Sequence, residues 1–458
     1  MKDVDKDNLI PGVPRHAGKG VRFVPALALT VLLACVVFSC MLSFQAGNGE
    51  SGGAQSLREK LNDAGLPAIY IYTRGGKSPT FVETDPPEGA RGRTIKDNAY
   101  INGYCEITNL GSGRAFTSRM KVKARGNTTA RAAGVEGKMP YKLVLKDAAD
   151  LFENGHVESR YALLATQGQD LRTHLSFLIG QQCGMKWTPD CRFVNVVLND
   201  DYRGVYLLVS AVDGASLSEH VGPQGFMIEC DAYWWNESVY FEAVAIGPKK
   251  YYTVKYPDGE RLTDARLQQI KEYMDALGND IKKDGASDRI DMETFIAWLM
   301  TRDITGEIDA AGANIYYYME KFDAGDPERF KLHMGPLWDF DNTFRRDGVC
   351  DGKWSPQREN RGLYFRYLLK NEAFIAGYGD CWNRVSPSLI DVARSGLQAL
   401  IEAEGRSINA SRRLDAERWG SSMVTIEDEA EEKIDWLKDR MAWIDSQLAG
   451  EDANGETA

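Results

Sequence analysis

One uncharged stretch near the N-terminus constrains this chain more than any other feature. Residues 23–44 (FVPALALTVLLACVVFSCMLSF) carry no charged side chain, and as a helix they are long enough to cross a bilayer. Lys19 and Arg22 directly precede them, so the positive-inside rule leaves residues 1–22 in the cytoplasm and the body of the chain outside. We therefore expect a membrane-anchored protein with an extracytoplasmic body.

A lipoprotein signal is the alternative interpretation of this segment. The sequence Leu32 to Cys35 (LLAC) resembles a lipoprotein signal-peptidase box. The apolar residues that continue past Cys35 favour an anchor helix, because processed lipoproteins usually turn polar there. Both interpretations place the body outside the cytoplasm. The Gly- and Ser-rich residues 45–58 predict a flexible linker.

The composition fits a globular body and excludes one class of partner. Fifty-five basic against sixty-six acidic residues give a net charge of −11, so nucleic-acid binding, which needs a basic footprint, is not expected. Five histidines make a His-based metal site or a Ser-His-Asp triad unattractive. The cysteines outside the anchor are even in number, which is compatible with disulfides in an exported domain, and they lack zinc-site spacing; they are Cys105, Cys183, Cys191, Cys230, Cys350 and Cys381.

Strand patterns predominate before residue 215. In residues 116–125 apolar and polar side chains alternate with a period of two, which predicts a half-buried strand. Residues 170–180 read as a helix. Other expected strands are 68–72, 141–145 and the two arms of a hairpin, 193–198 and 204–212.

Helical spacing predominates after residue 225. Apolar residues recur every three or four positions, and Asp291 is a plausible N-cap. The segments are 267–277, 295–300 and 434–448. We expect a β-rich lobe over residues 59–215, a mainly helical lobe over 216–450 and a disordered tail over 451–458.

The strongest local motif is the pair of carboxylates Asp339 and Asp341 in GPLWDFD. Two carboxylates at the end of an apolar segment can flank a hard cation such as Mg²⁺. A polar turn after a buried strand is the plain alternative. Thirty residues earlier, Asp309 precedes Asn314 by five positions. Protein kinases place a catalytic aspartate before a metal-binding asparagine in this way and supply a second metal aspartate followed by Phe, as Asp339 is here.

A basic turn is the third motif. Arg125 and Asn127 lie in KARGNTT, and Lys138 and Lys142 follow in KMPYK. A Gly-containing turn with an Arg, followed by a strand bearing Lys, can approach phosphates through backbone N–H groups and cations. The alternative is a hairpin whose basic edges are merely solvated.

Two rival families share parts of these motifs. The sequence DFDNT, beginning at Asp339, matches the opening motif of haloacid-dehalogenase-type phosphatases, in which the first Asp is a nucleophile. That family needs an apolar strand before the motif and a βα alternation after it, and here mostly charged helical sequence follows. A glycosyltransferase-type DxD is disfavoured because no doubly wound nucleotide-binding half precedes it.

Taken in order, the segments resemble the CotH kinase family of spore-coat-protein-H-like atypical kinases. The resemblance covers about residues 60–448, and it implies a kinase-like two-lobed α+β fold, ATP and Mg²⁺ as cofactors, and a protein substrate. The matching stretches are KARGNTT, KMPYKLVL, YALLATQGQDLRTHLSFLIGQQCGM, VNVVLNDDYRGVYLLVSAVD, GFMIECDAY, MTRDITGEIDAAGANIYYYME, GPLWDFDNTF and WLKDRMAWID.

The resemblance also implies roles for single residues. Asp309 matches the catalytic-loop aspartate, Asp339 with Asp341 matches the metal-binding WDFD, and Asn314 is the second metal ligand. Arg125 and Asn127 match a turn expected to contact phosphate, and Glu229 an acidic position that opens the second lobe, which we assign to cofactor binding. Asp170 and Arg172 match the first-lobe helix.

Which lysine contacts phosphate stays open at this point. Strand alternation favours Lys142, whereas the family's usual lysine pair falls nearer Lys138. The chain also departs from the family pattern, and these departures predict altered nucleotide affinity. They are Ser210 in place of Glu, Asp303 and Glu307 in place of Glu and Asn, and Arg345 in place of Gly.

The leading hypothesis is a membrane-anchored kinase that transfers the γ-phosphate of ATP to Ser or Thr hydroxyls of a protein. The second hypothesis is an exported surface or envelope module that keeps the fold for binding alone, because ATP is scarce outside the cytoplasm. Binding of Mg·ATP distinguishes the two.

Overall fold

The computed structural model describes most of the chain that follows the linker. The predicted N-terminus and anchor, residues 1–44, lie outside the described residues, as do Asp170, Asp309 and Cys350. Among the residues described, no helix is both long and apolar enough for a membrane span. The described residues are 55–88, 94–96, 98–111, 113–165, 171–213, 217, 220–243, 250–307, 314–327, 329–346 and 364–454.

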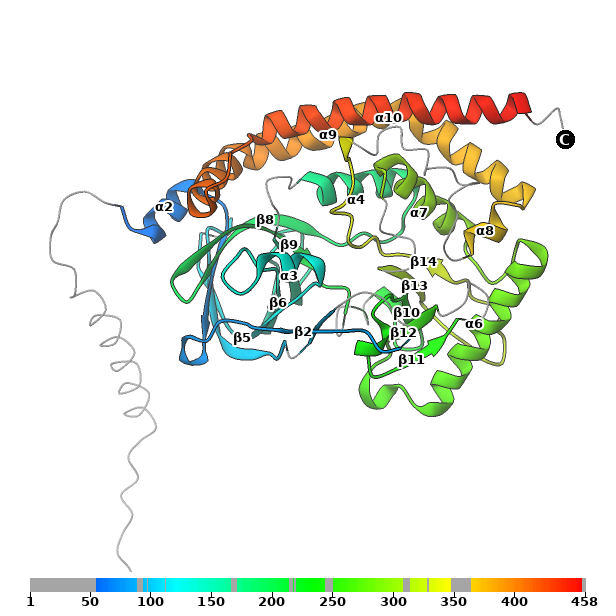
Figure 1. Cartoon of the computed structure of the whole chain (residues 1–458), viewed down its shortest axis with the longest axis horizontal. Coiled ribbons are helices and arrows are strands. Elements are labelled where there is room, and N and C mark those ends of the chain that lie inside the picture. Colours follow the sequence, from blue (N-terminus) through cyan, green and yellow to red (C-terminus); the bar gives the residue numbers. More distant parts are fainter. Residues whose placement is uncertain are drawn as a thin grey trace, which may run out of the picture. The chain divides into compact units, whose positions relative to one another are not determined.

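A closed seven-stranded barrel forms the β-rich part of the chain (Figure 1). Its strands pair antiparallel, except that β1 and β8 close the barrel in parallel. In barrel order the strands are β1 (Ala68–Thr73), β4 (Ile101–Thr108), β5 (Phe116–Ala124), β6 (Tyr141–Ala149), β7 (Glu158–Leu164), β9 (Asp201–Ser210) and β8 (Cys191–Leu198).

The period-two pattern places apolar side chains inside the barrel. Val122 of β5 and Leu143 of β6 are cross-strand partners with no exposed surface. Their neighbours Lys123 and Lys142 are also partners and therefore point to the outer face. The strands expected from the sequence over residues 116–125 and 141–145 are confirmed; closure into a barrel was not predicted.

A second, five-stranded antiparallel sheet lies in the part of the chain after residue 225. Every residue of β10 and β13 is buried, so these strands show no alternation from which sequence reasoning could recognise them. In sheet order the strands are β11 (Tyr240–Glu242), β12 (Tyr251–Tyr256), β10 (Phe226–Cys230), β13 (Ile315–Met319) and β14 (His333–Met334). A small hairpin pairs β2 (Val82–Thr84) with β3 (Thr94–Lys96).

Helices make up most of the remainder, so the fold is a mixed α+β one. Asp291 caps α7 as expected, because its side chain accepts the Thr294 N–H. The helices are α2 (Leu57–Ala64), α3 (Thr128–Ala133), α4 (Leu171–Cys183), α6 (Asp264–Asp284), α7 (Met292–Thr305), α8 (Phe365–Leu368), α9 (Glu372–Trp419) and α10 (Ile426–Asn454); short 3₁₀ turns are η1 (Arg74–Gly76), η2 (Trp234–Asn236) and η3 (Gly259–Arg261).

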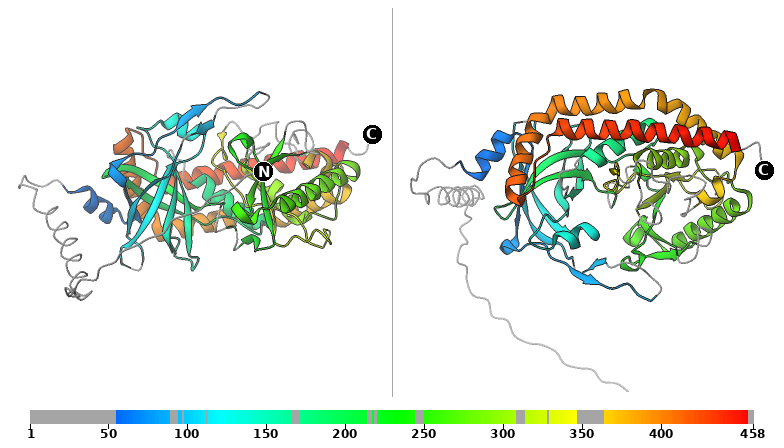
Figure 2. Two further views of the ribbon diagram at one scale, coloured as in Figure 1. Left: turned by 90° about the horizontal axis from the view of Figure 1, so that it is seen from below. Right: turned by 45° about the horizontal axis from the view of Figure 1, so that its top comes forward.

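Helices α9 and α10 form a long antiparallel pair along one side of the barrel and of the helical part (Figures 1 and 2). The 48-residue α9 contacts α2 and β9 as well as α4 and α7. One helix therefore joins both parts of the fold. Helix α10 continues through Asn454, four residues into the segment expected to be a tail.

Candidate functional site

The structure brings together two of the predicted metal-binding residues. Asn314 directly precedes β13 and Asp339 follows β14, and these strands pair antiparallel, so both residues lie at one end of the sheet. The Asn314 amide donates a hydrogen bond to Oδ2 of Asp339 at 2.7 Å. Both residues adopt left-handed backbone conformations (φ 59° and 63°), which Asn and Asp tolerate better than most residues.

The segment after Asp339 is held by three helices. Arg172 of α4 donates to the carbonyl oxygen of Asp341 at 2.9 Å. The indole of Trp436 in α10 donates to the carbonyl of Arg345 at 2.7 Å, and the Phe344 N–H donates to the carbonyl of Thr305 at the end of α7 at 2.9 Å. Residues 339–346, which begin at the first Asp of the WDFD sequence, are called the WDFD loop below. These contacts fix the position of its backbone.

The donor types of this site fit Mg²⁺. Carboxylate and amide oxygens are the hard ligands that this ion takes, and Asp341 is exposed beside Asp339. Asp309, the predicted catalytic aspartate, lies outside the described residues. In the described part of the chain, no three His, Cys, Asp or Glu side chains gather into a ready-made metal cluster.

Four cations line the outer face and end of the barrel and form what we call the cationic wall: Lys123, Arg125, Lys142 and Arg160. Lys123 and Lys142 are direct cross-strand partners. Arg160 is the cross-strand partner of Val144, which lies two residues after Lys142 on β6, so Arg160 lies on the same outer face as Lys142. Like charges placed opposite one another repel, so the wall favours an anion in front of it.

Asp213, three residues after β9, supplies part of that negative charge. Its carboxylate forms an ion pair with Nζ of Lys142, and it lies 3.6 Å from Nη1 of Arg160. Burial, followed by repulsion from surrounding cations, nevertheless lowers the pKa of Lys142 to about 7. The contributing cations are Lys123, Arg160, Arg125 and Lys255.

Arg125 connects the cationic wall to the WDFD sequence. Its guanidinium lies over the ring of Trp338, 5.4 Å from the centroid, and Trp338 immediately precedes Asp339. Arg125 is also one of the charges that lower the pKa of Lys142. Asn127 has a local contact, since its side-chain oxygen accepts the Ile95 N–H of β3 at 3.3 Å.

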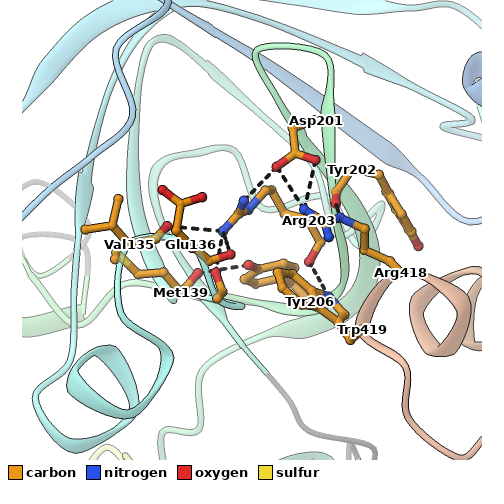
Figure 3. Close-up of polar contacts among 10 residues, drawn as sticks. Val135, Glu136, Met139, Asp201, Tyr202, Arg203, Tyr206, Arg418 and Trp419 are labelled. Atoms are coloured by element: carbon orange, nitrogen blue, oxygen red, sulfur yellow. Dashed lines mark hydrogen bonds and ion pairs between the residues drawn. The ribbon is translucent and has the colours of Figure 1, made fainter.

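Lys138, the other candidate lysine, lies in a different environment. Its Nζ forms a 2.7 Å ion pair with Asp415 of α9 and lies 5.6 Å from the ring centroid of Tyr206. Figure 3 shows the adjoining turn, in which Arg203 donates to the backbone carbonyls of residues 135–137 and the Tyr206 hydroxyl donates to that of Met139. The contacts of Lys138 thus join the barrel to α9.

Glu229 of β10 is buried against a lysine. Its carboxylate lies 2.9 Å from Nζ of Lys255 in β12. The same Nζ lies 3.0 Å from the carboxylate of Glu237 and 3.7 Å from that of Asp231. Burial raises the pKa of Glu229 to about 7, although Lys255 opposes the increase. Lys255 is also one of the cations that lower the pKa of Lys142.

Three of the four residues expected to depart from the family pattern are buried, and Arg345 is half-buried. Ser210 ends β9 and is buried, and its N–H donates to the carbonyl of Asp190 at 3.0 Å. Asp303 is buried in α7 and accepts the Tyr378 hydroxyl at 2.9 Å. Glu307 is also buried, and the Arg345 side chain donates to Asn342 at 2.8 Å.

Sequence reasoning missed several members of the site. Lys123 was recoverable, because the alternation that predicted β5 puts it on the same face as Arg125. Asp213 ends a stretch that resembles the family but was given no role, and Arg160 and Lys255 lie outside the recognised motifs. The pairing of β6 with β7 brings Arg160 near Lys142, the pairing of β7 with β9 brings Asp213 there, and Lys255 lies on β12 of the second sheet.

Comparison with known proteins finds one family match over most of the chain. A family model described as CotH kinase protein matches residues 122–444, from β5 to α10, which is most of the chain. A search among curated proteins finds no match. The resemblance expected from the sequence is confirmed, and the chain belongs to the CotH kinase family.

Proposed function

We propose that this chain is an ATP-dependent phosphotransferase that acts on Ser or Thr hydroxyls of a protein. The observation that carries the proposal is the Asn314–Asp339 contact, joined through Trp338 and Arg125 to the cationic wall. An acidic metal-type site beside clustered cations suits a polyphosphate with its metal. Family membership supports a kinase-like protein.

In phosphoryl transfer the basic side chains would contact the phosphates, and an acidic side chain would contact the acceptor hydroxyl. Lys142 and Arg125 would neutralise phosphate oxygens. Both candidate lysines have a carboxylate partner, and Lys142 is favoured because it lies among the other cations of the wall, whereas Lys138 pairs with Asp415 of α9. Asp309 would orient the acceptor hydroxyl. Phosphoryl transfer depends mainly on positioning and electrostatic stabilisation, so this small set is sufficient.

Asp339, Asp341 and Asn314 would hold Mg²⁺. When bound, that ion neutralises charge on the phosphates. The chain's own contribution is to fix the ligands: Arg172 and Trp436 hold the backbone of the WDFD loop, and the Asn314 amide orients the Asp339 carboxylate.

The location of the body is part of the proposal. Residues 23–44 would anchor the protein in a membrane with the body on the extracytoplasmic side, and the uncharged length of the segment supports this. An exported kinase would need ATP, or another phosphodonor, in that compartment.

The test compares binding and turnover of Mg·ATP in the full chain and four variants. Asp339→Ala and Lys142→Gln should each abolish turnover while the circular dichroism spectrum stays unchanged. Asp326→Ala and Lys146→Gln are matched controls, since both side chains are exposed and Lys146 lies on the same strand as Lys142. Turnover that survives in Asp339→Ala contradicts the proposal. A parent protein without any Mg·ATP-dependent thermal shift favours the non-catalytic binding module.

A further inference from the structure

Two buried cysteines from distant parts of the chain meet where α4 ends. Cys183 is the last residue of α4 and Cys381 lies in α9, 198 positions later. Their exposed fractions are 2 % and 5 %, and each thiol shifts the pKa of the other. Sγ of Cys381 also lies 3.6 Å from the carbonyl oxygen of Cys183. Both are thiols in this structure.

Arg384, one turn after Cys381, makes the two sulfurs unequal. Its Nη2 donates to Sγ of Cys381 at 3.4 Å and to the carbonyl of Cys183 at 3.0 Å, and its Nη1 donates to the carbonyl of Gln182 at 3.0 Å. The neighbouring Cys183 thiol and the charge of Arg384 lower the pKa of Cys381, whereas the Cys381 thiol and burial raise the pKa of Cys183. Cys381 is therefore the better nucleophile.

The other described cysteines have different surroundings. Burial raises the pKa of Cys105, Cys191 and Cys230 to about 12 in each case. Cys191 follows Cys183 in the sequence, but its sulfur contacts a histidine: it lies 3.5 Å from Nδ1 of His174. The geometry thus singles out one pair among the described cysteines.

We propose that Cys183 and Cys381 form a disulfide, between α4 and α9, when the protein folds under oxidising conditions. The oxidant is a second disulfide, such as oxidised glutathione. The Cys381 thiolate attacks one sulfur of the oxidant, forming a mixed disulfide and releasing one thiolate. Cys183 then loses its proton to solvent and its sulfur attacks that of Cys381, which releases the second thiolate. Two electrons pass to the oxidant, which is reduced to two thiols.

The bond would stabilise the fold in the region that supports the WDFD loop. Helix α4 carries Arg172 at its other end, where it holds the carbonyl of Asp341. A link that closes a loop of this length restricts the unfolded chain strongly. This inference rests on the two helices alone and does not require kinase activity.

The test refolds the full-length chain in a glutathione redox buffer, because both thiols are buried once the protein has folded. Alkylation and peptide mapping under non-reducing conditions should find a Cys183–Cys381 peptide pair, about 2 Da lighter than the two free peptides. The oxidised protein should melt about 5 °C above the reduced protein.

Three variants test the assignment. Cys230→Ser removes a solitary buried thiol and should keep the linked pair. In Cys183→Ser and in Cys381→Ser the linked peptide pair should be absent, and the melting temperature should be the same in oxidising and in reducing buffer. The proposal is overturned if both cysteines of the refolded parent are alkylated, or if either is found linked to another cysteine.

Discussion

Binding of Mg·ATP near pH 8 should be accompanied by proton uptake at Lys142. In the ligand-free protein the pKa of this amine is about 7, so about one-tenth of it is protonated at pH 8 and about nine-tenths at pH 6. Phosphate oxygens stabilise the ammonium form and return its pKa toward the ordinary 10.5. Binding should then take up about 0.9 proton at pH 8 and about 0.1 proton at pH 6.

The same change in protonation sets the affinity. Because only the protonated fraction is ready to bind, affinity should fall about tenfold from pH 6 to pH 8, or about 1.4 kcal/mol. Isothermal titration in buffers of different ionisation enthalpy measures the proton uptake, with excess Mg²⁺ so that the nucleotide stays ionised. Lys142→Arg is the matched control, because a guanidinium keeps its charge at both pH values. Equal uptake by parent and Lys142→Arg at pH 8 would refute the reasoning.

The unfolding free energy of the ligand-free protein should rise with pH, whereas the affinity for Mg·ATP should fall. Since folding lowers the pKa of Lys142, the unfolded chain binds more protons between about pH 7 and the ordinary lysine pKa. The destabilisation is complete below pH 7 and is relieved as the pH rises. Lys142→Gln should therefore flatten the rise in unfolding free energy across this range, measured by urea titration.

Further predictions concern the contacts around the site. Asp213→Asn removes the carboxylate that pairs with Lys142, so proton uptake on Mg·ATP binding at pH 7 should exceed the roughly half proton expected for the parent, by the same calorimetric assay. Arg412→Ala leaves the buried Glu429, its 2.5 Å ion-pair partner, without that cation, and urea unfolding should show a loss of about 3–5 kcal/mol; a loss below about 1 kcal/mol would contradict a buried pair. Trp436→Phe removes the hydrogen bond to Arg345, and turnover assays should need several-fold more Mg²⁺, whereas Trp443→Phe on the same helix should not.

The strands that could be predicted from the sequence are those with one face buried and the other exposed to solvent. Strand β5 was recognised because its inner residues, such as Val122, alternate with outer lysines. Strands β10 and β13 are buried on both faces, so their sequences lack that alternation. Barrel closure depends on the pairing of β1 with β8, whose partners Ala68 and Asn195 are far apart in sequence, and no local pattern encodes it.

The site was predictable in type but only partly in geometry. The residue types and order of Asn314 and Asp339 predicted that the two residues share a site, whereas their contact depends on the pairing of β13 with β14. Alternation correctly put Lys142 outside the barrel, opposite in direction to Leu143. The ion pair between Lys138 and Asp415 requires α9 to pass the end of the barrel, which sequence periodicity does not reveal.

Helix α9 also has a mechanical consequence. At about 1.5 Å per residue, its 48 residues follow a bent path (Figure 1) about 72 Å long, with Pro387 inside the helix, and they contact the barrel and the helical part alike. These contacts oppose rotation of the two parts about the connection after β9, because such a rotation would break the packing of α9 on one of them. Exchange of a bound molecule should therefore rely on small movements of individual loops, and the scattering profile of the protein should change little when nucleotide binds.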